Sequence, residues 1–217
     1  MVPDLYTQLK TIRENINGLS KNTAPLWHPL GFVSCVVSNK EDLVTRLHYW
    51  PKNQKKPKCP DWPIHTHLFT LTSLVLHGQI KDIQYRPSSG KQYSALSVEY
   101  VGVNSKLIPT GDLFDLKVIR ETVLQRHGSY IVEEGVFHQS EVHSEDETMT
   151  LVQCANPTNR PPIVVAPTEE LDLLRGVNFD YLREPFSREV FWEKARVFLT
   201  EFMEEKGTTN SVLHKFS

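Results

Sequence analysis

The stretch HTHLFTLTSLVLHGQIKDIQYR, residues 65–86, decides the fold. Two apolar runs, 67–77 and 79–86, carry the β-branched and aromatic residues that favour strands. Gly78 separates them eleven residues after His67, where the turn of a hairpin is expected. The stretch therefore predicts a β framework that starts at a pair of histidines.

Further β-type runs flank this stretch on both sides. They are GFVSCVV (31–37), DLVTRLHYW (42–50), YSALSVEYVGV (93–103), SYIVEEGVFHQSEVH (129–143) and TMTLVQCA (148–155). Turn signals divide them at PSSG (87–90) and PTGD (109–112), and residues 113–126 could form a short helix, a strand pair or a mixture of the two. Many short strands at close spacing predict an all-β sandwich or small barrel over residues 26–166.

Helical patterns flank this region. Apolar residues recur at three- and four-residue spacing over 4–19, so residues 1–25 should form an N-terminal helical segment. Residues 167–217 should hold C-terminal helices over 168–175 and 187–207, with Ser187 as N-cap and Gly207 at the end, followed by a tail. We expect the helices to pack on the β core within a single domain, 1–217.

The composition excludes several classes of function. The chain has 217 residues, a mass of 25.0 kDa, a net charge of -2 and a pI near 6.5, so nothing electrostatic favours nucleic-acid binding. The sequence lacks both a long apolar run and an apolar signal segment, which predicts no membrane association and no export. Three cysteines (Cys35, Cys59 and Cys154) without metal-type spacing indicate a reducing, cytoplasmic location.

Three histidines are the candidate metal ligands. On a strand, residues i and i+2 point to the same face, so His65 and His67 can offer two imidazoles to one ion. Two histidines at this spacing, without a third candidate ligand, more often have a structural role than bind a metal. His138, on a distant β-type run, can supply a third nitrogen. Three neutral nitrogens suit a divalent transition metal and leave coordination positions open for substrate or oxygen.

At these motifs the chain resembles the cupin superfamily. The first cupin motif places a glutamate and then a glycine after H-x-H; here His65, His67 and Gly78 match, and Leu71 occupies the glutamate position. In the second motif, P-x-G-x-x-H, a glutamate replaces the proline and His138 matches the histidine. The resemblance covers roughly residues 31–160 and implies a jelly-roll barrel, or double-stranded β-helix.

Within the cupins, the thiol dioxygenases are most similar, because they bind iron through three histidines without a carboxylate. The resemblance implies that His65, His67 and His138 hold Fe(2+), with nickel, copper, zinc and cobalt as alternatives. Arg46 is the nearest basic candidate for the family's active-site arginine. Trp62 and Phe137 lie close enough to the ligands in sequence to shape a substrate pocket.

The expected function is thus a non-haem metal-dependent dioxygenase that acts on a small anionic metabolite with O2. The alternatives are a metal-dependent isomerase or lyase of the cupin type that uses no oxygen, and a non-catalytic cupin binding module. Cysteine itself is a poor substrate candidate, because the residues that recognise it in the family are missing here. The terminal helices could serve a homodimer as easily as a monomer.

Overall fold

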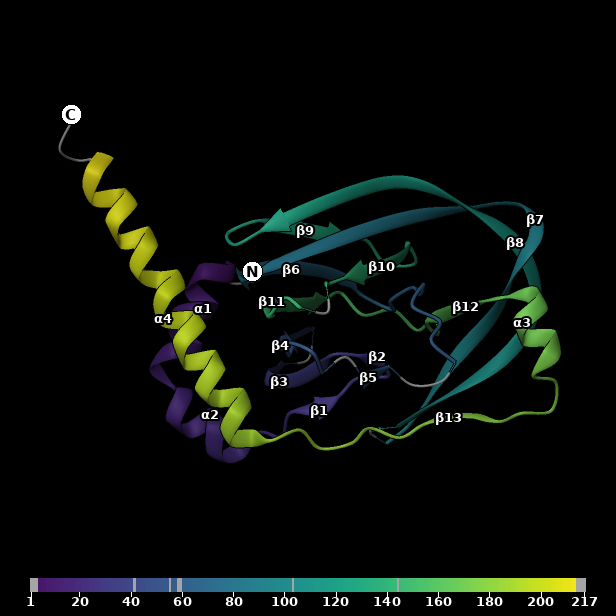
Figure 1. Ribbon diagram of the computed structural model, residues 1–217, viewed down its shortest axis with the longest axis horizontal. Coiled ribbons are helices and arrows are strands. Elements are labelled where there is room, and N and C mark those ends of the chain that lie inside the picture. Colours follow the sequence, from purple (N-terminus) through teal and green to yellow (C-terminus); the bar gives the residue numbers. More distant parts are fainter. Residues whose placement is uncertain are drawn as a thin grey trace.

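The computed structural model describes residues 4–40, 42–54, 56–57, 60–102, 104–143 and 145–213. Cys59 and the last four residues of the predicted tail lie outside these ranges. Two antiparallel β-sheets form the body of the molecule (Figure 1). Helices α1 (Leu5–Glu14), α2 (Ile16–Asn22) and α4 (Arg188–Leu213) lie at one end, and α3 (Thr168–Leu173) lies at the other.

The first sheet has the order β1-β3-β4-β11-β6-β9. Its strands are β1 (Leu26–Trp27), β3 (Val33–Lys40), β4 (Leu43–Trp50), β11 (Thr148–Ala155), β6 (Thr70–His77) and β9 (Ser129–Val132). The second sheet has the order β10-β7-β8-β13, and β12 also pairs with β7. Its strands are β10 (Phe137–Glu141), β7 (Gln79–Val101), β8 (Asn104–Gln125), β13 (Phe179–Tyr181) and β12 (Ile163–Pro167). A separate two-stranded sheet joins β2 (Leu30–Gly31) to β5 (Lys56–Pro57).

The order of the strands is that of a jelly roll. In the first sheet, β11 returns late in the chain to lie between β4 and β6. In the second, β10 lies between β7 and the segment around His65. His65 pairs with His138 of β10 through an antiparallel backbone bridge. Two facing antiparallel sheets, between which the chain alternates in this way, form a double-stranded β-helix. The predicted fold class, mainly β with flanking terminal helices, is confirmed.

Gly78 is not the turn of a hairpin, contrary to the prediction. The strands before and after it, β6 and β7, belong to different sheets, so the chain crosses from one sheet to the other at this residue. Gly78 has a φ of 76°. A Cβ atom there would lie 2.2 Å from the carbonyl oxygen of Glu147. Glycine is needed both for the left-handed backbone and for the close approach of the neighbouring chain.

The second sheet is built on two strands that are longer than predicted. β7 and β8 span 23 and 22 residues, and run along the length of the molecule (Figure 1). The expected turns at 87–90 and 109–112 lie inside these strands, where shifts in register absorb the extra residues. Residues 113–125 are strand and not helix. The sheet also extends past residue 166, because β13 pairs with β8.

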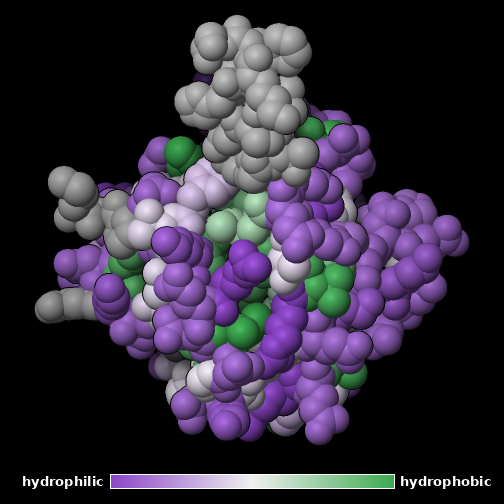
Figure 2. Space-filling model, turned by 90° about the vertical axis from the view of Figure 1, so that its left-hand side faces the viewer, coloured by the Kyte–Doolittle hydropathy of each residue, from purple (hydrophilic) through white to green (hydrophobic). Residues whose placement is uncertain are grey.

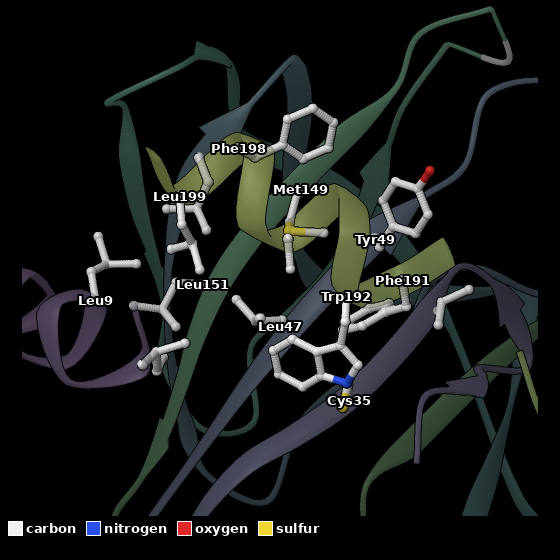
Figure 3. Packing of buried hydrophobic residues seen from close by; sticks show 14 of the residues in the cluster. Leu9, Cys35, Leu47, Tyr49, Met149, Leu151, Phe191, Trp192, Phe198 and Leu199 are labelled. Atoms are coloured by element: carbon white, nitrogen blue, oxygen red, sulfur yellow. The ribbon is translucent and has the colours of Figure 1, made fainter. Parts of the chain in front are cut away.

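The largest apolar core lies between the first sheet and the helices. Figure 3 shows Leu47 and Met149 of the sheet among Phe191, Trp192 and Phe198 of α4. As predicted, the Ser187 hydroxyl accepts a hydrogen bond from the Val190 amide at the start of α4. The helix continues past Gly207 to Leu213. None of the described helices is long and apolar enough to cross a membrane.

Side chains on β4 alternate between the apolar core on one face of the first sheet and a cavity on its other face. Leu47 and Tyr49 point into the core beneath the helices, whereas Arg46 and His48 line a cavity between the two sheets. The outer surface at the helical end is hydrophilic over most of its area, with hydrophobic side chains visible between the polar ones (Figure 2). The helices therefore close one side of the barrel, and the cavity is left between the sheets.

Candidate metal centre

The three predicted histidines meet in the structure. One nitrogen atom from each of His65, His67 and His138 lies within 4.8 Å of the others. The His65 amide donates to the His138 carbonyl at 3.0 Å, and the His138 amide donates to the His65 carbonyl at 2.8 Å. Residues that exchange both backbone hydrogen bonds across an antiparallel pair have their side chains on the same face. His67 joins them because it lies two residues further along the same segment.

Hydrogen bonds orient two of the imidazole rings. The Nδ1 atom of His65 lies 2.8 Å from the carbonyl oxygen of Pro63, which can only accept, so Nδ1 carries the proton. The Nδ1 atom of His138 lies 3.0 Å from Oδ1 of Asp82 and donates to this carboxylate. In both rings the unprotonated Nε2 atom is left to bind a ligand.

The separation of the nitrogens fits a shared ion. The Nε2 atoms of His67 and His138 are 2.9 Å apart. Two imidazole nitrogens bound at right angles, each roughly 2.1 Å from a divalent metal, would be separated by about 3 Å. Among the described residues the ligand group contains no carboxylate, and Leu71, at the cupin glutamate position, lines the nearby cavity. The residues therefore fit a three-nitrogen metal site with open positions.

Asp82 supports this centre, and sequence reasoning did not single it out. Its carboxylate is fully buried, and it accepts a second hydrogen bond from Nε2 of Gln84 at 2.9 Å. The same amide nitrogen donates to the carbonyl of Ile131 at 2.8 Å, which fixes Gln84 against β9. A carboxylate behind a ligating histidine sets its tautomer and increases its basicity. The available signal was an aspartate between two isoleucines in the β-type run QIKDIQY.

Two of the three histidines, His65 and His67, are neutral at physiological pH. Burial, followed by the neighbouring His138, lowers the pKa of His65 to about 3, and the bond to Pro63 opposes the shift. Burial, followed by the nearby His65 and His138, holds the pKa of His67 well below its ordinary value. A neutral imidazole is the form that coordinates a metal, so no proton has to be displaced from these two rings near pH 7.

The histidines lie in the wall of a cavity of about 1050 Å³. Trp62 also lines it, as predicted from its position before His65. Phe137 is not part of the described wall: it lies on the opposite side of β10 from His138, and its ring packs against Phe114 with centroids 5.4 Å apart. Its proposed role in shaping the pocket is therefore not supported, because neighbouring residues on a strand face opposite ways.

Arg46, His48 and Cys154 also line the cavity. The Nε atom of Arg46 is buried without a hydrogen-bond partner. His48 has a buried Nε2 atom without a hydrogen-bond partner. Cys154 faces the cavity as well, and burial raises the pKa of its thiol to about 11, which keeps it protonated at neutral pH.

No family model and no curated protein matches this sequence. Among solved structures, the hydroxypropylphosphonic acid epoxidase from S. wedmorenis is 16% identical, with a TM-score of 0.37 over 61% of this chain and 56% of the epoxidase. A hydroquinone 1,2-dioxygenase solved with Cd2+ and 4-hydroxybenzonitrile is 14% identical, with a TM-score of 0.35 over 72% and 80%. Drosophila melanogaster CENP-C bound to CAL1 is 12% identical, with a TM-score of 0.35 over 70% and 100%. The chain thus spans little more than half of the epoxidase, and at these TM-scores the likeness assigns no activity.

Proposed function

We propose that this protein is a non-haem, metal-dependent oxygenase of the cupin type, with iron as its metal and a small anionic metabolite as its substrate. The observation that carries the proposal is the convergence of His65, His67 and His138, without a carboxylate, in the wall of a large cavity. Three neutral ligands leave the full charge of a divalent ion uncompensated, which favours an anionic substrate. The resemblance to the three-histidine thiol dioxygenases agrees with this reading.

The chain's own residues have separate tasks in this proposal. The three imidazoles bind the metal, and Asp82 holds the proton on Nδ1 of His138 so that Nε2 stays available. Trp62 and Leu71 form part of an apolar wall that excludes water from the substrate. Arg46 adds a positive charge on the same wall. When bound, iron would supply Lewis acidity and the redox capacity that oxygenation requires.

Oxygen consumption tests the proposal. The protein, loaded with Fe(2+), is given a panel of thiols, diketones and amino acids in an oxygen electrode. We expect one class of substrate to drive oxygen uptake, and we expect His138→Ala to abolish it. His127→Gln is the matched control, because this histidine lies outside the described cavity wall and pairs with Glu205.

The outcomes separate the proposal from its alternatives. Conversion of a substrate at the same rate without oxygen would replace the oxygenase with an isomerase or lyase. A protein that binds no metal at all would contradict every enzymatic reading and leave a cupin binding module.

A further inference from the structure

Two arginines meet the same cavity from distant parts of the chain. Arg46 projects from β4, on the same side of the strand as His48. Arg183 follows β13, near the C-terminal end of the second sheet, and also lines the cavity. The Arg183 amide donates to Oδ1 of Asn104 at 3.1 Å, which holds this segment beside the start of β8.

Within the part of the chain that the structure describes, neither guanidinium forms an ion pair. The Nε atoms of Arg46 and Arg183 are both buried without a hydrogen-bond partner. Burial, followed by the positive charge of Arg46 on the same cavity wall, lowers the pKa of Arg183, and Tyr100 opposes the shift. Arginine stays charged in proteins, so the pair presents two positive charges and two Nε donors without a partner to the cavity.

Two histidines connect the arginines with the metal centre. The ring of His28 stacks on Phe32 with centroids 4.4 Å apart, and Phe32 contacts His48 at 4.7 Å. Burial holds the pKa of His28 well below its ordinary value, and the charges of Arg183 and His65 act in the same direction. His28 therefore lies within electrostatic reach of both the arginine pair and the metal ligands. The two sites are parts of one continuous cavity.

We propose that Arg46 and Arg183 form an anion-binding subsite that holds the far end of an elongated substrate, whose terminal group is a carboxylate or a phosphate. Planar guanidinium groups suit the oxygens of either anion. The other end of the same molecule would lie at the three histidines. This last step rests on the proposed function, whereas the binding of an anion by the two arginines does not.

The test uses metal-free protein, so that failure of the metal site cannot be confused with failure of this subsite. Inorganic phosphate and succinate are titrated separately, and binding is followed by the rise in Tm and by calorimetry. We expect saturable binding of at least one probe, weakened by at least about tenfold in both Arg46→Met and Arg183→Met. Which probe binds more tightly distinguishes a phosphate from a carboxylate. Arg175→Met is the control, because this exposed arginine already pairs with Asp172.

The Tm values of the unliganded variants separate a binding role from a structural one. Removing a buried, unpaired charge relieves repulsion, so Arg46→Met and Arg183→Met should unfold at the same temperature as the unchanged protein or at a higher one. Equal binding of phosphate and succinate by all variants, or no binding of either by the unchanged protein, would overturn the proposal. A lower Tm in both unliganded variants would also overturn it, because it would show that the arginines stabilise the fold.

Discussion

The hydrogen bond between Asp82 and Nδ1 of His138 shows how a single residue can orient a candidate metal ligand. The Asp82 carboxylate accepts from Nδ1 of His138, and Gln84 holds the carboxylate in place from the other side. Such a chain of buried hydrogen bonds fixes the direction in which Nε2 points. The candidate metal site therefore includes residues behind the three ligands. Its affinity for a metal should depend on Asp82, which never contacts the ion.

Replacement of Asp82 by asparagine tests this dependence. Asp82→Asn removes the negative charge and weakens the acceptor for His138, so we expect the affinity for a divalent metal to fall about 10- to 100-fold. Titration calorimetry with Zn²⁺ or Fe²⁺ measures it. Asp180→Asn is the matched control, since Asp180 is exposed on β13. Equal affinities in the two variants would show that Asp82 has no influence on the ligand.

The residues of the site were predictable where they follow a local period. The two-residue spacing within one segment brings His65 and His67 together, and the resemblance to the cupins adds His138. Asp82 and Arg183 were not predicted, because their roles depend on pairing between strands far apart in sequence. Phe137 does not line the described cavity for a simpler reason: it is adjacent to His138, and adjacent residues on a strand face opposite ways.

Among the elements, the passage from β6 to β7 matters most, because it carries the chain between the two sheets. Local sequence cannot distinguish it from a hairpin, since a glycine between two apolar runs is typical of both. The same limit explains why turns were predicted at 87–90 and 109–112, where the structure has continuous strands. Pairing with a long neighbour keeps both segments within β7 and β8, and this tertiary interaction overrides the local turn signals.

Alanine at Gly78 should be costly for stability. Gly111 also has a positive φ, 88°, but no atom lies within 4 Å of a Cβ there, so Gly111→Ala measures backbone strain alone, about 1–2 kcal/mol. Gly78→Ala adds the clash with Glu147 and should cost a further 1–3 kcal/mol or so. Urea denaturation gives both free energies of unfolding. Equal losses would mean that the neighbouring chain does not crowd Gly78.

At the scale of the whole molecule, the barrel encloses several histidines in neutral form. Burial is the largest cause of the lowered pKa of His28, His48, His65 and His67. Once unfolded, each regains a pKa near 6.5 and binds protons below that pH, whereas the folded protein does not. Falling pH therefore favours the unfolded state, over a window from 6.5 down to the lowered values, about 3 for His65.

The metal-free protein should accordingly lose stability on mild acidification. Each buried histidine can remove up to about 1.4 kcal/mol of unfolding free energy per pH unit below 6.5. Urea denaturation at pH 7.5 and pH 5.0 should show a clearly smaller free energy of unfolding at the lower pH. His48→Leu, which removes one of these groups, should reduce the difference. An unfolding free energy that stays constant between these two pH values would be incompatible with histidines that remain neutral in the fold.

Metal content tests the central claim most directly. Protein purified without chelator is analysed for bound transition metal and then titrated with Fe²⁺ or Zn²⁺, alongside a His65→Ala, His138→Ala double variant and His127→Gln. The structure predicts one equivalent of metal per chain in the unchanged protein and in His127→Gln, and loss of binding in the double variant with the fold intact. Binding far below one equivalent, or binding that survives in the double variant, would contradict a three-histidine metal centre.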